Sequence, residues 1–468
     1  MLPVAHAWRI LGLAVIALAG CSLLVDQNLA DKPREDGGGG GGGGTAGAGA
    51  GSTTSASGSG MGGIPIGCDG SCDPAACCGG GCVDLNTNAD HCGTCDKACL
   101  AGRVCSGGKC VPAWAAMSSA FSFAPRVDAA ATWTGSSMFV WGGFDDAKDR
   151  ADGALYYPEK DTWEAISNGF APSARALAAA VWTGSRVIVF GGGPSGSQDA
   201  FGDGAQYDPA SDTWSALKSP GPPSAARRLP MAFWSGSLAV FWGGEAKGAP
   251  LASGLRYDPA GDTWTPVTKT GAPSARRGAA WAWTGSKLLI FGGTIDGVGA
   301  TSEGFLYDPK LDQWSAMSPT NAPSARYDAF AVWMGDASGA GELLVWGGRG
   351  AGDKEVDTGA RYNPATDQWQ AISTQGSPSK RSAPMGRSGF TAWTGLRALV
   401  VGGADGQNFK TDGGSFEPAN DAWSAPVPSW PNGKSHERGV GLWTGRELIV
   451  WGGRDGGSLV EGGERYLP

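Results

Sequence analysis

Residues 175–214 read RALAAAVWTG SRVIVFGGGP SGSQDAFGDG AQYDPASDTW. In this stretch a tryptophan stands before Thr-Gly, a short apolar run leads to paired glycines, and a Tyr-Asp-Pro turn leads to a second tryptophan. The same order recurs seven times along the chain at a spacing of about fifty residues, which indicates a repeat architecture.

The tryptophans show how regular the repeat is, because eighteen of the 21 fall into register on it. Seven stand before Thr-Gly or its equivalent. Six follow the Tyr-Asp-Pro turn or its equivalent, and Trp114 at the start of the array completes this second set. Four directly precede the paired glycines. In that order they are Trp133, Trp182, Trp234, Trp283, Trp333, Trp393 and Trp443; Trp114, Trp163, Trp214, Trp264, Trp314, Trp369 and Trp423; and Trp141, Trp242, Trp346 and Trp451.

Each unit contains four short segments rich in β-branched and aromatic residues, separated by Gly, Pro, Asp and Ser. Such segments are typical of antiparallel strands, and Asp-Pro followed by polar residues is typical of a turn. The first segment is small (Ala178–Ala180) and the last carries a large residue (Trp214), which favours a wedge that is narrow at an axis. We therefore predict an all-β fold, a seven-bladed β-propeller over residues 111–468.

The two ends of the repeat array are complementary. The seventh unit runs to Tyr466, two residues before Pro468, and has no following Asp-x-Trp segment. A segment with the matching tryptophan, Pro112-Ala113-Trp114, stands alone before the first unit, and Trp114 precedes Trp133 by the same spacing that separates Trp163 from Trp182. We expect this N-terminal strand to complete the seventh blade and close the ring, since closure removes exposed strand edges.

With its paired glycines, the tyrosine after them and the tryptophan that follows, the chain resembles the kelch-repeat family over about three quarters of its length. The resemblance implies a kelch-type β-propeller. It also implies a binding platform, since most kelch propellers are platforms and a few are oxidases or sugar-modifying enzymes. The fold alone does not choose among these functions.

The segment before the repeats has the features of export. Residues 1–20 contain an apolar run that is too short to span a membrane and fits a signal peptide. The run ends in Leu18-Ala19-Gly20-Cys21, which matches a bacterial lipobox and makes Cys21 the predicted site of lipidation. Residues 21–67 are rich in Gly and Ser and are expected to form a flexible tether. We predict an exported protein, lipid-anchored at the bacterial outer membrane or cell surface.

Residues 68–110 form a small disulfide-rich module in this interpretation, because ten cysteines after an export signal are typical of a disulfide framework. They are Cys68, Cys72, Cys77, Cys78, Cys82, Cys92, Cys95, Cys99, Cys105 and Cys110. Their connectivity cannot be read from the sequence. The strings C-C-G-G-G-C-V-D-L-x-T and C-G-x-C resemble cysteine-rich surface lipoproteins of myxobacteria.

Two metal sites are alternatives for parts of this module. Cys92-x-x-Cys95 beside His91 has the residue types of a zinc site. The oxygen-bearing residues that alternate from Asp84 to Asp90 follow the start of a calcium loop, but the run lacks the glycine of such a loop. Turn formation by Asn and Asp is the competing interpretation. We expect no metal and no cofactor.

Composition narrows the classes of partner and of chemistry. The net charge is −8 and no basic block occurs, so nucleic acid is not an expected partner. The propeller has a single histidine, His436, and no cysteine, which excludes a copper-radical oxidase. No nucleophile elbow, zinc-protease motif or phosphate-binding loop is present.

An arginine stands seven positions before the inner-strand tryptophan in five of the seven blades. The blades that break the pattern are the sixth, with Gly386 at this position and Arg387 beside it, and the seventh, with His436 followed two residues later by Arg438. In kelch binding domains such arginines can line a channel mouth, and guanidinium groups suit acidic ligands. Repetition in nearly every blade instead favours bonds to neighbouring carbonyls. The ligand-binding candidates are Arg126, Arg175, Arg227, Arg276, Arg326, Arg387, His436 and Arg438.

Three functions are compatible with these features. The first is a non-catalytic binding protein for a protein or polysaccharide ligand, attached to a membrane only through its lipid. The second is a carbohydrate-active enzyme that resembles the kelch-type sialic-acid mutarotases and uses Glu437 or a nearby carboxylate. The third is a structural spacer. We favour the first, because the sequence contains no catalytic motif.

Overall fold

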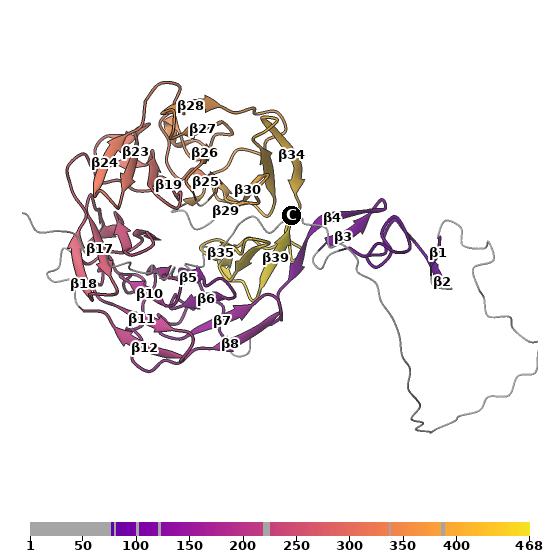
Figure 1. Cartoon of the computed structure of the whole chain (residues 1–468), viewed down its shortest axis with the longest axis horizontal. Coiled ribbons are helices and arrows are strands. Elements are labelled where there is room, and N and C mark those ends of the chain that lie inside the picture. The colour runs from indigo at the N-terminus through magenta and orange to yellow at the C-terminus, as the bar shows by residue number, and fades with distance from the viewer. Residues whose placement is uncertain are drawn as a thin grey trace, which may run out of the picture.

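The computed structural model describes residues 76–78, 81–99, 103–119, 123–218, 225–336, 338–384 and 389–468. Seven antiparallel sheets in these ranges lie around a central axis, with the colour advancing around the ring in chain order (Figure 1). The described ranges contain no α-helix. The predictions of an all-β fold and of a seven-bladed propeller are confirmed.

Six blades each take four consecutive main strands from one repeat. Blade 1 consists of β5 (Ala130–Trp133), β6 (Met138–Trp141), β7 (Gly153–Tyr157) and β8 (Thr162–Ala165). Blade 2 consists of β9 (Ala179–Trp182), β10 (Val187–Phe190), β11 (Gly204–Asp208) and β12 (Thr213–Ala216). Blade 3 consists of β13 (Met231–Trp234), β14 (Ala239–Trp242), β17 (Gly254–Asp258) and β18 (Thr263–Pro266). Blade 4 consists of β19 (Ala280–Trp283), β20 (Leu288–Phe291), β23 (Gly304–Asp308) and β24 (Gln313–Ala316). Blade 5 consists of β25 (Phe330–Gly335), β26 (Gly341–Trp346), β27 (Gly359–Asn363) and β28 (Gln368–Ala371). Blade 6 consists of β29 (Gly389–Trp393), β30 (Ala398–Gly402), β33 (Gly413–Glu417) and β34 (Ala422–Val427).

Blade 7 combines the two ends of the repeat array. Its strands are β35 (Val440–Trp443), β36 (Leu448–Trp451) and β39 (Gly463–Leu467), followed by β4 (Lys109–Ala116) from the other end. β4 pairs antiparallel with β39 so that Trp114 lies opposite Tyr466, just as Trp214 lies opposite Tyr207 in blade 2. The predicted closure by the N-terminal strand is therefore confirmed.

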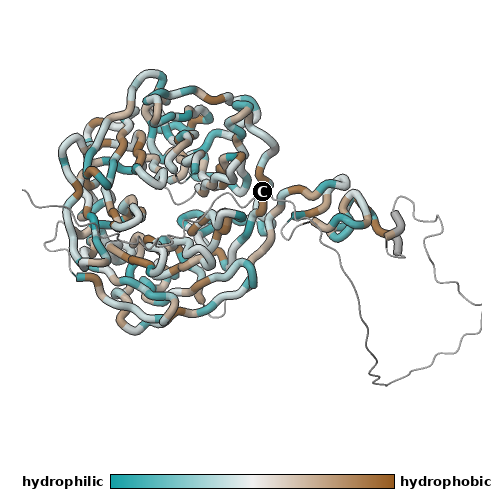
Figure 2. Tube along the Cα trace, viewed as in Figure 1, coloured by the Kyte–Doolittle hydropathy of each residue, from teal (hydrophilic) through white to brown (hydrophobic). Residues whose placement is uncertain are grey.

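The hydrophobic core is divided among the interfaces between blades. Seven clusters of buried apolar side chains each join residues of two consecutive blades. At one interface, Phe139 and Leu155 of blade 1 pack with Val189 and Trp214 of blade 2. Apolar and polar stretches alternate around the whole ring (Figure 2), as short strands joined by polar turns require.

The connection between the second and third strands carries a small hairpin in four blades. These hairpins are β15 (Glu245–Ala246) with β16 (Ala249–Pro250), β21 (Thr294–Ile295) with β22 (Gly299–Ala300), β31 (Ala404–Asp405) with β32 (Asn408–Phe409), and β37 (Arg454–Asp455) with β38 (Ser458–Leu459). In blade 5 this connection contains a 3₁₀ turn, Ala351–Asp353. Each connection bridges back to a residue just before an inner strand, as Arg277 does with Thr294. These loops therefore lie at the end of the ring where the inner strands begin, which is here called the channel mouth.

The cysteine-rich module is joined to blade 7 through its strands. β3 (Arg103–Ser106) pairs with β4 and makes this sheet five-stranded, while β1 (Ala76–Cys78) and β2 (Gly81–Val83) form a separate hairpin. The predicted boundary between residues 110 and 111 falls inside β4. Arg103 also donates a hydrogen bond to the carbonyl oxygen of Pro468, which ties the module to the C-terminal strand.

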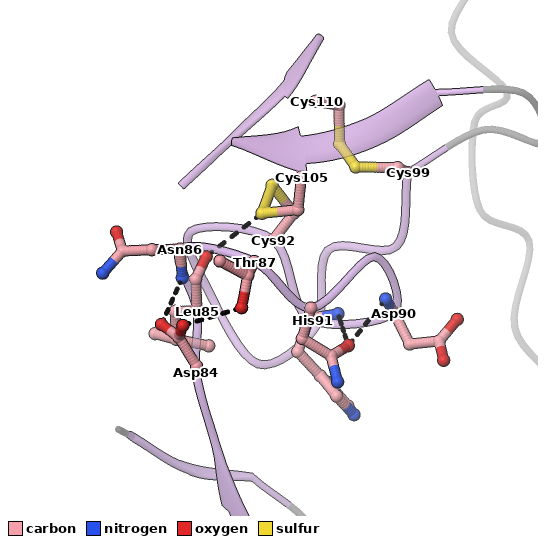
Figure 3. Close-up of a disulfide and its surroundings, with 11 residues drawn as sticks. Asp84, Leu85, Asn86, Thr87, Asp90, His91, Cys92, Cys99, Cys105 and Cys110 are labelled. Atoms are coloured by element: carbon pink, nitrogen blue, oxygen red, sulfur yellow. Dashed lines mark hydrogen bonds between the residues drawn. A yellow bond between two sulfur atoms is a disulfide. The ribbon is translucent and has the colours of Figure 1, made fainter. Parts of the chain in front are cut away.

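Three disulfides join described cysteines of the module: Cys78–Cys95, Cys92–Cys105 and Cys99–Cys110. Figure 3 shows the last two beside the turns that begin at Asp84. Cys92 and Cys95 belong to different disulfides, so the alternative zinc site has no pair of thiolates there. The sulfur atoms of Cys92, Cys99 and Cys110 lie within 4.8 Å of one another, but all three are disulfide-bonded.

The oxygen atoms of the alternative calcium loop serve the local turns. The Asp84 carboxylate accepts the backbone N–H of Asn86 at 2.9 Å and the hydroxyl of Thr87 at 2.7 Å. The side-chain oxygen of Asn88 accepts the backbone N–H of Asp90 at 2.8 Å. These bonds agree with the interpretation of this run as turns.

Residues 1–67, including Cys21, and the cysteines Cys68 and Cys72 lie outside the described residues. The signal peptide, the lipidation site and the tether therefore stay predictions. No helix within the part of the chain that the structure describes has the length and hydropathy that crossing a membrane requires.

Candidate functional site

An arginine stands before the inner strand of six blades and is almost fully buried, with 0–4% of its surface exposed. In blade 2, Arg175 donates from Nε to the carbonyl oxygen of Ser173 at 2.8 Å and from Nη1 to that of Gly191 at 3.1 Å. The other five arginines make the same two bonds to carbonyls of their own repeat. The six are Arg126, Arg175, Arg227, Arg276, Arg326 and Arg381.

A third partner completes each arginine site. It is an acidic side chain in four blades (Asp152, Asp203, Glu303 and Asp412) and a hydroxyl side chain in two (Ser253 and Thr358). Where the partner is a hydroxyl, burial lowers the pKa of the arginine to about 10, which still leaves it protonated at neutral pH.

The guanidinium groups of these arginines are thus occupied by partners within their own blades. The geometry gives Arg126, Arg175, Arg227, Arg276 and Arg326 a structural role, and their role in ligand binding stays a prediction.

Blade 7 replaces this site by a neutral one. His436 takes the place of the arginine, is 1% exposed, and has Nδ1 2.7 Å from the carbonyl oxygen of Gly452. Burial lowers the pKa of His436 to about 4, so the ring is uncharged at neutral pH. Gly462 stands where the other blades carry the acidic or hydroxyl partner. A neutral ring needs no counter-charge, so the two replacements fit one another.

In blade 6 the structure assigns the arginine site to Arg381 and not to the position of Gly386. Arg381 is fully buried and lies 3.0 Å from Asp412. The extra residues of this blade therefore follow the arginine site, and Arg387 falls in the segment 385–388, outside the described residues. Its predicted role stays a prediction.

Two residues after the arginine site, hydrogen bonds join neighbouring blades in a partial ring, here called the axial ring. Its members are Asp128, Leu177, Leu229, Gly278, Asp328, Ala383 and Arg438. Five backbone N–H groups of this ring donate to the carbonyl oxygen of the member in the preceding blade, as Leu177 does to Asp128 at 3.0 Å. The ring fixes the entrance of the channel at the start of the inner strands.

Arg438 is the basic member of the axial ring, and it pairs with Asp128 of blade 1. Its Nε lies 3.1 Å from Oδ1 of Asp128, and its Nη2 bonds the other carboxylate oxygen. The Asp128 side chain is 1% exposed, whereas that of Arg438 is 32% exposed. The pair links the last blade to the first. Burial raises the pKa of the adjacent Glu437 against the opposing effect of Arg438 and Arg454.

A cavity of about 320 Å³ opens beside the axial ring among blades 3 to 6. Leu229, Gly278, Asp328 and Ala383 of the ring line it. Its walls come from the inner strands, through Met231, Trp281, Phe330 and Thr391, and its charged members are Glu245, Arg276, Arg277 and Asp328. This volume lies at the small end of the range of ligand pockets, about 300–1,000 Å³.

Trp281 breaks the repeat inside this cavity. It stands two residues before the inner-strand tryptophan, where the other blades have Ala131, Ala180, Ala232, Ala331, Thr391 and Gly441. Its surface is 37% exposed. The sequence analysis did not single it out, although it is one of the three tryptophans outside the register of the repeat.

The charged side chains at the rim of the cavity are partly paired. Arg277 has Nη1 2.5 Å from Oδ1 of Asp296 and Nε 3.7 Å from Oε2 of Glu245, and it also bonds the carbonyl oxygen of Gly248. These contacts link the loops of blades 3 and 4. The Arg277 side chain is still 37% exposed, so part of it remains open to solvent.

Comparison with known proteins agrees with this architecture. Residues 113–293 and 278–461 each match the family described as the KLHDC2/KLHL20/DRC7 Kelch-repeats domain. The two matches together extend over most of the propeller. A search of curated proteins finds no match to the chain.

Proposed function

Because this chain belongs to the kelch-repeat family, whose propellers generally serve as scaffolds for protein interactions, we propose that it is a non-catalytic binding protein that engages a partner protein at its channel mouth. The observation that carries the proposal is the cavity among blades 3 to 6, which departs from the symmetry of the repeat. A site for an asymmetric ligand must break the symmetry of its scaffold, whereas structural features repeat in every blade.

The loops at the mouth support this placement. The connections between second and third strands surround the entrance and carry exposed charges, such as Asp296 and Asp353, with side chains 62% and 65% exposed. Binding residues concentrate on loops held by a rigid scaffold. A polysaccharide is the second class of ligand proposed for this mouth.

The enzyme alternative has weaker support. Glu437 lies in the backbone bridge to Arg454 beside the Asp128–Arg438 pair and is not among the described residues that line the cavity. A catalytic carboxylate needs a substrate space within hydrogen-bond reach. We therefore favour binding over catalysis.

The proposal includes export and a lipid anchor at Cys21, with residues 21–67 holding the module and propeller away from the membrane surface. The three disulfides support it, because such bonds persist in oxidising compartments. Replacing the thiol by Cys21→Ser should prevent lipidation, lower the mass by the acyl chains and move the protein from the detergent phase to the aqueous phase. An unchanged mass and detergent partitioning would reject the anchor.

The binding site is tested by paired arginine variants in the full chain. A protein and glycan array first identifies a ligand, and its affinity is then measured by calorimetry. Arg277→Ala removes a partly exposed, ion-paired arginine at the mouth, and Arg186→Ala removes a similar one at the turn between β9 and β10. We expect Arg277→Ala to weaken binding about tenfold or more and Arg186→Ala to leave it unchanged. Equal effects, or loss only with Arg186→Ala, would place the site elsewhere.

A further inference from the structure

A second cavity lies at the outer edge of the ring, at the junction between blades 4 and 5, and shares no lining residue with the cavity at the mouth. It has a volume of about 380 Å³ and is here called the junction pocket. One wall is the segment after β24, and the other is the turn that leads into β28; these are the outer strands of the two blades (Figure 1). Its lining includes Ser318, Thr320, Asn321, Asp367, Gln368 and Trp369.

The tryptophan of this junction lacks a hydrogen bond that its counterparts make. In the other six blades the outer-strand tryptophan donates its indole N–H to a carbonyl oxygen in the segment after the preceding blade, as Trp314 does to Thr268 at 3.1 Å. Trp369 is 4% exposed, yet its indole N–H has no hydrogen-bond partner among the residues that the structure describes. Buried donors without an acceptor are destabilising and rare in folded proteins.

The missing contact falls between two residues that line the pocket. Asp367 accepts the backbone N–H of Ser318 at 2.8 Å, just as Asp312 accepts that of Thr268 at 3.1 Å. Ser318 is therefore the counterpart of Thr268, and its carbonyl oxygen is the counterpart of the acceptor that Trp314 bonds. The indole N–H and the carbonyl group that are bonded in the other junctions are thus separated here at the junction pocket.

The same junction has an asparagine where two other junctions have glycine. Asn321 has a φ angle of 60°, and the equivalent residues Gly271 and Gly376 have φ angles of 74° and 76°. A Cβ on either glycine would lie 3.4 Å from the carbonyl oxygen of the outer-strand tryptophan. The asparagine therefore places a hydrogen-bonding side chain beside Trp369, at a backbone angle that asparagine tolerates.

The described residues that line the pocket are polar and include no basic group. Thr320 contributes a hydroxyl group, and Gln368 contributes an amide. Asp367 carries the one charge of this lining, and its Oδ1 already accepts the Tyr362 hydroxyl at 2.7 Å besides the backbone N–H of Ser318. A carboxylate without basic neighbours opposes an anion, whereas amides and hydroxyls suit an uncharged ligand with several hydrogen-bonding groups.

We propose that the junction pocket binds one residue of a neutral sugar. The space between the indole N–H of Trp369 and the carbonyl oxygen of Ser318 takes a group that accepts from the first and donates to the second, and a hydroxyl does both. Neighbouring hydroxyls of the sugar then meet the amides of Asn321 and Gln368. A volume of about 380 Å³ is at the small end of the range of ligand pockets and suits a single ring. This site is independent of the partner proposed at the channel mouth.

A water molecule is the competing occupant, because water also accepts and donates hydrogen bonds. Water supplies one oxygen atom, whereas a sugar presents several hydroxyls on one ring. Saturable binding that depends on the hydroxyls of the ligand and on Asn321 therefore separates a sugar site from a hydration site.

The test uses the full chain with nitrogen-15-labelled tryptophan, which gives one indole N–H resonance per tryptophan. The resonance missing from Trp369→Phe belongs to Trp369, since this change removes the indole N–H and keeps an aromatic ring in the core. The probes are the methyl pyranosides of glucose, galactose, mannose and N-acetylglucosamine. The negative probe is 2-methoxytetrahydropyran, which has the ring without the hydroxyl groups.

We expect at least one glycoside to shift the Trp369 resonance in a saturable manner and 2-methoxytetrahydropyran to leave it in place. Asn321→Gly should weaken binding of that glycoside about fivefold or more, because the amide is lost. This variant should fold, because glycine occupies the equivalent place in two other junctions. Its matched control is Phe170→Gly, the same change at the equivalent place between blades 1 and 2, where φ is 64°. The control should leave the affinity unchanged, and calorimetry measures both variants.

Three outcomes would overturn the inference. They are the absence of a saturable shift with every glycoside, which would leave the space to water; equal binding of 2-methoxytetrahydropyran; and an affinity in Asn321→Gly no lower than in Phe170→Gly. Arg277→Ala separates this site from the mouth. Loss of glycoside binding in Arg277→Ala would place the sugar at the mouth and reject the junction site. Glycoside binding that Asn321→Gly weakens, together with partner capture that Arg277→Ala leaves intact, would support the junction site and reject the mouth.

Discussion

At the scale of residues, buried polar groups define this propeller. Each arginine before an inner strand has its charged guanidinium group buried from solvent. The buried charge is tolerated because the guanidinium group bonds carbonyl oxygens and an acidic or hydroxyl side chain. Where blade 7 has a histidine, the acid is absent too, so charge and counter-charge disappear together.

Removing one of these arginines should destabilise the fold. We expect Arg175→Met to lower the free energy of unfolding by about 2–3 kcal/mol, because the Gly191 carbonyl loses its buried donor and Asp203 loses its cation. Arg186→Met in the same blade removes an exposed ion pair and should cost less than about 0.5 kcal/mol. Denaturant unfolding measures both. Similar small losses in the two variants would show that the buried arginine is not structural.

A buried carboxyl in the closing blade should make stability depend on pH. Glu464 on β39 is 3% exposed, and burial raises its pKa to about 7 from an ordinary value of 4.5. The folded state thus binds this proton more tightly than the unfolded state, so the contribution to stability is present at low pH and is lost as pH rises through about 7.

Glu464→Gln should remove this dependence. We expect the variant to melt above the native protein at about pH 8.5 and close to it at about pH 5. Glu461→Gln changes an exposed carboxyl three residues earlier and serves as the control. A melting difference that is the same at both pH values would contradict a buried, proton-holding Glu464.

At the scale of elements, the Tyr-Asp-Pro-x-x-Asp-x-Trp segment connects blades. In blade 2 the Asp212 carboxylate accepts the Tyr207 hydroxyl at 2.8 Å and the backbone N–H of Ser167, from the segment after blade 1, at 2.8 Å. The indole N–H of Trp214 donates to the Ser167 carbonyl oxygen, also at 2.8 Å. The backbone N–H and the carbonyl oxygen of Ser167 are thus both bonded by side chains of the next blade. This double contact explains the fixed spacing between the aspartate and the tryptophan of the motif.

Blade 7, which combines the two ends of the repeat array, makes the same tryptophan contact with the preceding blade. Trp114 of blade 7 donates to the carbonyl oxygen of Pro428, which follows β34, at 2.8 Å. The aspartate of the motif falls where the chain of this blade is interrupted, between Tyr466 and Trp114. Proline has no backbone N–H, so it needs no carboxylate partner.

The aspartate of this connection is testable in blade 2. Asp212 has a φ angle of 50°, which aspartate and asparagine tolerate better than alanine does. We expect Asp212→Ala to lower the free energy of unfolding by about 1–3 kcal/mol, through lost hydrogen bonds and backbone strain, and Asp212→Asn to lower it much less. Denaturant unfolding of both variants is the measurement. Equal losses would mean that neither the acceptor oxygen nor the backbone angle matters.

At the scale of the whole molecule, the ring is closed by strand pairing between its two ends. β4 supplies the outer strand of blade 7, and β3 of the disulfide-bonded module covers the edge of β4. Cys110 on β4 is bonded to Cys99, so the closing strand is also fixed to the module covalently. The module thus protects the one blade that is assembled from separate parts of the chain.

Shortening the chain from its N-terminus should separate these contributions. A chain that begins at Ser119 loses β4 and the packing of Trp114, and we expect its melting temperature to fall by roughly 5–10 °C and its aggregation to increase. A chain that begins at Lys109 keeps β4 but lacks β3 and should melt closer to the full protein. If the chain from Ser119 melts with the full protein, strand closure does not stabilise the ring.

The sequence by itself determined the blades, their number and the closure by the N-terminal strand. Each of these depends on local periodicity, which can be read from neighbouring residues. The patterns are apolar runs of strand length, turn residues such as Asp-Pro, and spacings such as that from Trp114 to Trp133. These local patterns do not depend on which residues, distant in the sequence, a segment contacts in the fold.

Only the tertiary structure decided which side chains are buried, which are paired and which are open to a ligand. It buried the repeated arginines, placed Arg381 in the arginine site of blade 6, paired Arg438 with Asp128 and set the disulfides of the module. It also brought Trp281 into a cavity with residues of four blades. Side-chain direction depends on strand register and on partners far away in the chain, and a one-residue slip exchanges the two faces of a strand.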